Sequence, residues 1–240
     1  MEIVFILVEP AVPENIGAAA RALNTMGFQE LRLVKPADHL NDDARKLAHG
    51  SVHILENATL FSTLAEAVGD LDFVIGTTAK KRNIRSDYVP GDQLSSFLEQ
   101  KSGIITKCGL VFGREESGLT NEEIGLCDIL STIPIAAPYP SLNLAQAVML
   151  YAYQLSGLKL TLQASQEAGA KEYAVLKKQV TSLLAALGIS PVQPVYTRIF
   201  ERLALLNNTD VHLLLSITER ITPFVKSGEK PSGDRENQEI

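Results

Sequence analysis

Three residues near the start of the chain have types and spacing that could do chemistry: Asn15, Gly17 and Arg21. Arg21 lies among alanines, and an arginine in so apolar a segment suggests a specific anionic partner, such as a phosphate or a carboxylate. A strand-to-helix turn with Asn15 as the N-cap also explains Asn15 and Gly17. If the helix begins at Gly17, Asn15 and Arg21 can both face the same edge of a sheet.

A second candidate segment reads Phe112-Gly113-Arg114-Glu115-Glu116-Ser117-Gly118-Leu119. Two glycines around two acids imply tight or left-handed turns. Solvated charges in a turn are an alternative explanation of the two glutamates. The segment lacks the lysine pattern of a phosphate-binding loop, which disfavours a nucleoside triphosphate site of that kind.

A third segment, Ser141-Leu142-Asn143-Leu144-Ala145, follows prolines at positions 134, 138 and 140. The prolines stiffen the approach to the segment and suit a preorganised pocket. Ser141 or Asn143 can also serve only as the cap of the helix that follows.

The richest basic cluster follows three small residues, Thr77, Thr78 and Ala79, which let a ligand approach the backbone. It consists of Lys80, Lys81, Arg82 and Arg85. The net charge of −6 argues mildly against a nucleic-acid partner for the chain as a whole, so such binding must depend on local patches. We favour contact with RNA phosphates over a plain surface loop, because the cluster directly follows an expected strand.

The elements that must position these residues alternate along the first two thirds of the chain. Apolar runs without polar alternation, typical of parallel strands buried on both faces, occupy residues 3–8, 31–34, 73–76, 104–112 and 129–135. Helical patterns lie between them, near residues 17–26, 42–48, 62–69, 92–100, 121–127 and 143–157. The alternation predicts an α/β fold with a parallel sheet and helices on both sides. Ligands bind beyond the carboxyl ends of such strands, where all the candidate segments lie.

Strand-like runs stop after residue 157. We expect an α/β domain over residues 1–157, a linker over 158–169, a helical extension over 170–225 and a disordered tail over 226–240. The extension should contain helices at 170–187, 195–206 and 210–222, the last ended by Pro223.

Composition sets the class of protein. The 240 residues are 45% hydrophobic and 21% charged, as in ordinary soluble proteins. No run reaches the roughly 20 apolar residues of a membrane span, and no targeting segment is visible. Cys108 and Cys127 lie in apolar segments, which argues against a disulfide framework and fits a reducing cytosol. We therefore expect a cytoplasmic protein. The four histidines are scattered and lack the spacing of a metal site: His39, His49, His53 and His212.

Taken together and in order, the three segments resemble the three motifs of the SPOUT RNA 2'-O-ribose methyltransferases. The resemblance covers residues 1–157 and looks closest to the TrmJ group and its LasT-like relatives in the TrmH/TrmJ branch. It implies a SPOUT fold with a C-terminal trefoil knot, which general topology rules would argue against. It also implies a homodimer whose site is completed across the interface, an RNA substrate, S-adenosylmethionine as methyl donor and no metal.

The resemblance also assigns residues. The methyl donor is expected to contact, largely through backbone groups, Thr77, Thr78, Ala79, Gly113, Ile133, Pro134, Leu142 and Asn143. Catalysis or substrate placement falls to Asn15, Arg21, Glu115, Ser141 and Asn143. Arg21 is expected to hold a phosphate beside the reacting hydroxyl, since a guanidinium cannot act as a base. Glu115 is expected to fix either Arg21 or the loops.

The RNA species stays open at this point. The TrmJ group suggests tRNA, at anticodon-loop position 32, and LasT-like relatives suggest another tRNA site or rRNA. Three other functions compete: an RNA-binding relative that has lost catalysis, a methyltransferase acting on a base nitrogen, and an unrelated flavodoxin-like protein. The pair Asn15 and Arg21 favours ribose over a base nitrogen.

Overall fold

The computed structural model describes residues 1–79, 88–136, 142–158, 167–206 and 208–227. The chain divides into two compact units, Met1–Ala170 and Lys171–Ile240.

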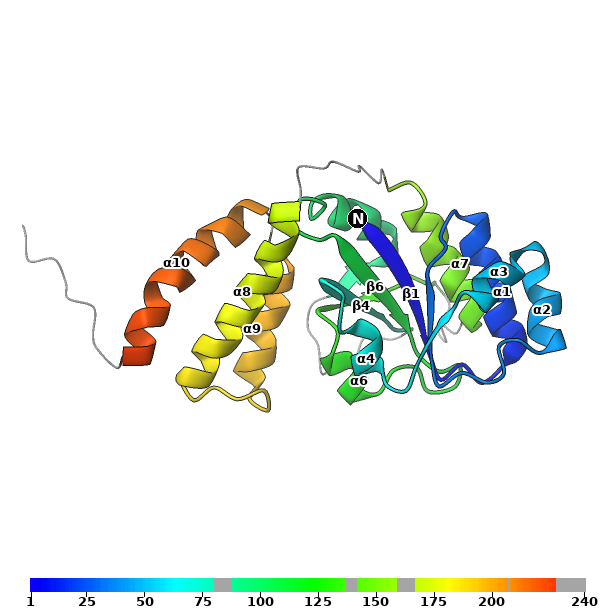
Figure 1. The fold of residues 1–240 in the computed structure, drawn as a ribbon, viewed down its shortest axis with the longest axis horizontal. Helices are drawn as coiled ribbons and strands as arrows, with labels where there is room; N and C mark the ends of the chain where they lie inside the picture. Colours follow the sequence, from blue (N-terminus) through cyan, green and yellow to red (C-terminus); the bar gives the residue numbers. More distant parts are fainter. Residues whose placement is uncertain (80–87, 137–141, 159–166, 207, 228–240) are drawn as a thin grey trace, which may run out of the picture. The chain divides into compact units, whose positions relative to one another are not determined.

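Within the described residues, the first unit is built on a seven-stranded sheet in the order β3-β2-β1-β6-β4-β7-β5 (Figure 1). Every neighbouring pair of strands is parallel. The strands are β1 (Glu2–Val8), β2 (Leu31–Val34), β3 (Thr59–Phe61), β4 (Phe73–Thr77), β5 (Tyr88–Pro90), β6 (Lys107–Phe112) and β7 (Ile129–Thr132). The predicted α/β class with a parallel sheet is confirmed.

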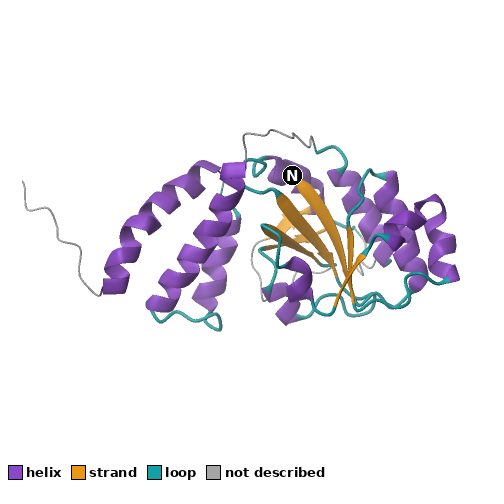
Figure 2. Cartoon of the chain, viewed as in Figure 1, coloured by secondary structure: helices purple, strands orange, loops and turns teal. Residues whose placement is uncertain are grey.

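Helices cover both faces of this sheet (Figure 2). They are α1 (Pro13–Thr25), α2 (Asp42–Ala48), α3 (Val52–Glu56), α4 (Leu64–Val68), α5 (Leu94–Glu99), α6 (Asn121–Gly125) and α7 (Leu144–Leu155). In Figure 1, α4 and α6 lie on one side of β1, and α1, α2, α3 and α7 lie on the other.

Alternate residues of β1 supply both layers of the core. Val4 and Ile6 belong to a buried cluster that includes residues of α4 and α6. Phe5 points to the other face, where its ring stacks on Phe112, which in turn meets Tyr151 of α7 edge-on. The strand is therefore apolar throughout because both of its faces are covered, which removes the polar alternation expected of a half-exposed strand.

Two edge strands were not predicted from the sequence. Both β3 and β5 have three residues, too few for a clear apolar run, and β5 ends in Pro90, which a sheet tolerates only at an edge or a strand end. The expected strand over 104–112 begins only at Lys107, because Ile104 and Ile105 form a buried turn whose amides donate to the carbonyl of Lys101. The last strand ends at Thr132, three residues before the predicted end.

The start of α1 also differs from the prediction. The helix begins at Pro13, with Val12 as its N-cap, because proline fits the first helical position, where no N–H bond is lost. Asn15 is therefore inside the first turn and is not the cap. The predicted knot depends on the path of residues 80–87 and 137–141, which lie outside the described residues, and it remains an expectation.

The helix α8 (Glu167–Ala186) runs from the end of the first unit into the second, which also contains α9 (Pro194–Ala204) and α10 (Asn208–Ser227). The buried residues of the second unit include Tyr173, Leu176, Leu203 and Val211. The prediction that Pro223 ends the last helix is wrong, since α10 continues past it to Ser227. A proline removes a single N–H bond, and one missing bond in the last turns does not stop a helix that is otherwise formed. No helix in the described residues has the length and apolarity needed to cross a membrane.

Candidate functional site

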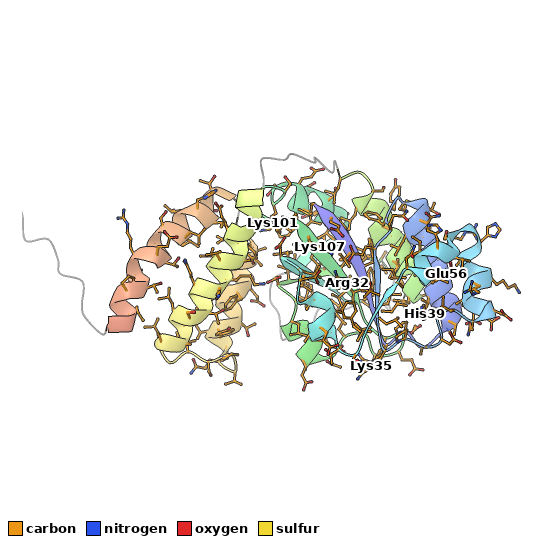
Figure 3. All side chains as sticks on the ribbon, in the orientation of Figure 1. Arg32, Lys35, His39, Glu56, Lys101 and Lys107 are labelled. Atoms are coloured by element: carbon orange, nitrogen blue, oxygen red, sulfur yellow. The ribbon has the colours of Figure 1, made fainter. Side chains whose placement is uncertain are left out.

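The carboxyl ends of β1, β6, β4 and β7 lie along one edge of the sheet, because these strands are adjacent and parallel. The loops beyond them carry the predicted site residues. Figure 3 marks the same edge by Lys35, which directly follows β2, while Lys107 marks the opposite edge at the start of β6.

Asn15, Glu115 and Asn143 are joined by hydrogen bonds at this edge. Nδ2 of Asn15 donates to Oε1 of Glu115 at 3.1 Å, and Nδ2 of Asn143 donates to Oδ1 of Asn15 at 2.7 Å. The three residues come from the first turn of α1, the loop after β6 and the N-cap of α7. The three sequence segments therefore meet in one cluster.

The direction of these hydrogen bonds is fixed by chemistry. An ionised carboxylate can only accept, so the Asn15 amide must turn its NH₂ toward Glu115. Its oxygen then faces Asn143, which must donate from its own NH₂. The Oδ1 of Asn143 is left to accept from the backbone N–H of Ala145 at 2.9 Å. Glu115 thus sets the orientation of both amides.

Asn143 also forms a capping box with Gln146, whose Oε1 accepts from the backbone N–H of Asn143 at 3.1 Å. The cap explanation and the site explanation both hold for this residue, because its oxygen serves the helix and its NH₂ serves Asn15.

Glu115 holds the β1–α1 loop rather than Arg21. Its carboxylate accepts from the backbone N–H of Ala11 at 3.1 Å and of Val12 at 3.3 Å, in addition to Asn15. Burial raises the pKa of Glu115, but the hydrogen bonds from Asn15, Ala11 and Val12 outweigh burial and leave this pKa below its usual value. A carboxylate with several donors and a lowered pKa is a poor proton acceptor, so Glu115 is suited to orienting its neighbours.

Two glycines close the loop that carries Glu115. The backbones of Arg114 and Gly118 exchange hydrogen bonds of 3.3 and 2.9 Å. A Cβ at Gly113 would run into the backbone of Gly118 and Leu119, and Gly118 has a φ of +68°. Both positions therefore need glycine, one for close approach and one for a left-handed conformation.

Ser131 of β7 is a buried polar residue that is hydrogen-bonded to Thr78, one of the expected methyl-donor contacts. Its carbonyl accepts from the backbone N–H of Thr78 at 3.0 Å, and its hydroxyl donates to the carbonyl of Val89 at 2.8 Å. The hydroxyl of Tyr151 donates to Oγ of Ser131 at 3.0 Å. Burial raises the pKa of Tyr151 to about 12, so its hydroxyl keeps its proton. These bonds tie the end of β4, β7, β5 and α7 together.

The positions expected to contact S-adenosylmethionine fit a ligand held by backbone groups. Thr77, Thr78 and Ala79 follow or end β4, Gly113 follows β6, and Ile133 and Pro134 follow β7. These three strands are neighbours in the sheet. Leu142 and Asn143 directly precede α7. Gly113 has no room for a side chain and is half-buried.

Arg21 does not join the cluster. Because α1 begins at Pro13, Asn15 and Arg21 lie about 120° apart around the helix axis and about 9 Å apart along it. Arg21 is exposed, and its guanidinium has no hydrogen-bond or ion-pair partner among the residues that the structure describes. The expectation that Asn15 and Arg21 can face the same edge of the sheet was conditional on a helix beginning at Gly17, and α1 does not meet that condition.

Some predicted site residues lie outside the described residues: Ser141, Lys80, Lys81, Arg82 and Arg85. Within the described part of the chain, no group of three or more His, Cys, Asp or Glu is arranged to hold a metal ion.

Sequence reasoning missed Arg114, although this residue stands inside the second motif. It bridges Glu9 at the end of β1 and Glu123 in α6, two elements that the sequence does not show to meet. A cation among acids was the available signal, but the sequence does not show which acids it meets. Ser131 and Tyr151 were missed because a serine in a strand and a tyrosine in a helix carry no motif.

Comparison with known proteins supports the motif assignment. Residues 2–153 match the SpoU rRNA Methylase family. The chain is 44% identical over 216 residues to the Escherichia coli (strain K12) protein named uncharacterized tRNA/rRNA methyltransferase LasT, covering 89% of this chain and 94% of that one. It is 42% identical over 154 residues to tRNA (cytidine-2'-O-)-methyltransferase TrmJ of Methanocaldococcus jannaschii, covering 62% of this chain and 65% of the relative. The crystal structure of TrmJ from Z. mobilis ZM4 superposes with a TM-score of 0.65 at 29% identity, covering 92% of this chain and all of that one.

Proposed function

Because this chain belongs to the SpoU rRNA methylase family, we propose that it transfers the methyl group of S-adenosylmethionine to a ribose 2'-hydroxyl of RNA, with tRNA favoured, in the cytoplasm. The observation that carries the proposal is the hydrogen-bonded cluster of Asn15, Glu115 and Asn143. It joins three segments that are separate in the sequence, next to the positions expected to hold the methyl donor.

The names of the relatives support the substrate class. The Methanocaldococcus jannaschii relative is named a tRNA (cytidine-2'-O-)-methyltransferase, and the Escherichia coli relative a tRNA/rRNA methyltransferase. We take anticodon-loop position 32 of tRNA, as Cm or Um, as the first site to test. A site in rRNA is the alternative.

Bound S-adenosylmethionine supplies an electrophilic methyl group on a positively charged sulfur. The task of the protein is to orient a weak nucleophile in line with that methyl group and to lower the cost of charge on the 2'-oxygen. Asn15 and Asn143 present amide groups that Glu115 has fixed in direction. Amides held in this way can position ribose hydroxyls through hydrogen bonds without reorganising during the reaction.

The proton of the 2'-hydroxyl leaves to a group outside this cluster. Glu115 is unsuited, since its lowered pKa makes it a weak base. An RNA phosphate and a water molecule are the two candidates. Arg21, which stays protonated, would then hold that phosphate and stabilise the developing charge.

We propose that Arg21 reaches the site of a second copy of the chain in a homodimer. Arg21 is exposed and about 9 Å along α1 from Asn15 of its own chain. The test is a mixed dimer of one Arg21→Ala chain and one Asn15→Ala chain, purified through two tags. If Arg21 acts across the interface, one intact site re-forms, and activity returns to about half that of the wild type although each variant alone is inactive. An inactive mixed dimer contradicts the proposal.

The basic cluster of Lys80, Lys81, Arg82 and Arg85 is proposed to contact RNA phosphates. Charge reversal at Lys80, Lys81 and Arg82 should weaken RNA binding and leave the affinity for S-adenosylmethionine unchanged. Lys46→Glu on α2 is the control, since it reverses an exposed charge that is not part of the cluster. Unchanged RNA affinity in the triple variant would remove the cluster from the RNA-binding surface.

The decisive experiment is methyl transfer from labelled S-adenosylmethionine to tRNA, and separately to rRNA, from cells that lack this protein. The products are digested and the modified nucleoside is identified by mass. A 2'-O-methylated nucleoside in the tRNA pool supports the proposal, and one in the rRNA pool supports the alternative. A methylated base, or binding of both ligands without transfer to either pool, contradicts it.

A further inference from the structure

Arg114 is held by carboxylates on two sides. Its Nε donates to Oε2 of Glu9 at 2.9 Å, and its two terminal nitrogens donate to the two carboxylate oxygens of Glu123, each at 3.0 Å. A bidentate pair of this kind fixes the plane of the guanidinium as well as its position. Glu123 is itself anchored, because it forms the capping box of α6 with Thr120.

Glu9 is placed for this contact by an unusual backbone. It is the first residue after β1 and has a φ of +46°, a backbone conformation that residues other than glycine rarely adopt. Its N–H donates to the carbonyl of Val34 at 2.8 Å, which continues the pairing of β1 with β2. Strain of this kind persists only where the surrounding contacts enforce it.

Arg114 and Glu115 are consecutive, and both hold the same loop. Arg114 binds Glu9 at the end of β1. Glu115 binds the next residues of that loop, through the N–H groups of Ala11 and Val12 and the side chain of Asn15. The loop after β6 therefore binds the β1–α1 loop at two adjacent points, through the cation of Arg114 at one and the carboxylate of Glu115 at the other.

We infer that Arg114 is a positioning residue: it sets the loop after β6 so that Glu115 can orient Asn15 and, through it, Asn143. This inference rests on the proposed function. Without the anchors at Glu9 and Glu123, the backbone at position 114 would keep only its contacts to Gly118 within the same loop. Glu115 would then no longer be held in register with Ala11 and Val12.

The test compares Arg114→Met with Arg32→Met as a matched control. Arg32 makes a similar cluster with Glu30 and Asp70, at 2.9 and 2.5 Å, but lies toward the opposite edge of the sheet (Figure 3). Both variants lose ion pairs of one arginine, so both should melt earlier than the wild type. Rates are therefore measured well below the lower melting temperature and normalised to the folded fraction.

We expect Arg114→Met to lower kcat by roughly 10-fold to 100-fold, because small misplacements of orienting groups have effects of this size. KM for S-adenosylmethionine and the Kd for RNA should change by less than about 3-fold, since neither ligand contacts Arg114 in this account. Arg114→Lys should recover part of kcat through one remaining ion pair. Arg32→Met should keep the kcat of the wild type.

A double variant separates an effect through Glu115 from a general one. If Arg114 acts through Glu115, Arg114→Met should lower kcat little further in a Glu115→Gln background, where the oriented contact is already lost. The inference is overturned if Arg114→Met keeps the kcat of Arg32→Met, or if the effects of Arg114→Met and Glu115→Gln multiply. A wild-type protein that methylates no RNA would instead contradict the proposed function, which keeps the two failures distinct.

Discussion

Asn143 donates a hydrogen bond from Nδ2 to Oδ1 of Asn15 at 2.7 Å, across 128 positions of sequence. This bond joins the N-cap of the last helix of the α/β unit to the first turn of its first helix. The contact forms because α1 packs along α7 and both helices start at the same edge of the sheet. The same bond, together with Glu115, decides which atom each amide can present to a substrate.

The first prediction concerns Asn143, whose oxygen caps α7 and whose NH₂ donates to Asn15. Asn143→Asp keeps an oxygen that caps α7 but removes the NH₂ that donates to Asn15, and aspartate caps helices as well as asparagine does. The cap is therefore kept, and the free energy of unfolding should fall only by the lost bond to Asn15, about 1 kcal/mol, while kcat for methyl transfer should fall roughly 10-fold to 100-fold. Thermal melting and initial rates give the two quantities.

Asn143→Ala serves as the comparison, because it removes both bonds and should lower the free energy of unfolding by about 1 kcal/mol more through the lost cap. If Asn143→Asp methylates RNA at the wild-type rate, the bond to Asn15 has no part in the reaction.

The long buried strands of this fold could be predicted from the sequence, and the short edge strands could not. β1 and β4 are buried runs of apolar residues, and such runs identify parallel strands by themselves. β3 and β5 have three residues each and are held by pairing with a neighbour. That pairing is a long-range contact that no local pattern records.

The sequence identified residues of the site, but it did not predict how their side chains contact one another. Asn15, Glu115 and Asn143 stand out by type and order, and the structure joins them directly. The direction of the hydrogen bonds follows only once Glu115 is seen to accept from the loop. The placement of Arg21 relative to Asn15 could not be predicted, because it depends on where α1 starts, and the start is set by Pro13 rather than by Gly17.

A second prediction concerns the tight approach at Gly113. Gly113→Ala would place a Cβ against the backbone of Gly118 and Leu119, which cannot move aside as a side chain can. The loop must shift, so binding of S-adenosylmethionine should weaken by at least about 10-fold, equivalent to 1.4 kcal/mol. Gly125→Ala is the control, since nothing lies within 4 Å of a Cβ there. Calorimetric titration with S-adenosylmethionine measures both variants, and equal affinities would show that this loop does not touch the ligand.

A third prediction concerns acid sensitivity at Glu115. Its pKa in the folded chain is lower than the ordinary 4.5, so its contribution to stability is present above that value and is lost as pH falls through the folded pKa. Glu115→Gln should therefore destabilise the protein by about 1 kcal/mol near pH 7, and the difference should shrink in acid, as the pH falls below 4.5 and through the lowered pKa of the folded chain. Urea unfolding at neutral and at acid pH tests this, with the exposed neighbour Glu116→Gln as control. A difference that is equal at both pH values would mean that the charge of Glu115 does not hold the loop.

The fourth prediction concerns Lys101, whose side chain is buried between two rings. Its ammonium lies 5.5 Å from the centroid of Phe73 and 4.9 Å from that of Phe97. Burial lowers the pKa of Lys101 to about 8, against an attraction to Asp128 that raises it. The folded protein therefore releases this proton before the unfolded chain does, so stability should rise as pH increases from about 8 to 10.5. The rise contributed by this one group is on the order of 3 kcal/mol.

Lys101→Met lacks the titrating group, so its unfolding free energy should show a smaller rise over the same range. The exposed Lys46→Met should follow the wild type. Parallel profiles for the wild type and Lys101→Met would mean that Lys101 is not held in a buried, desolvated state.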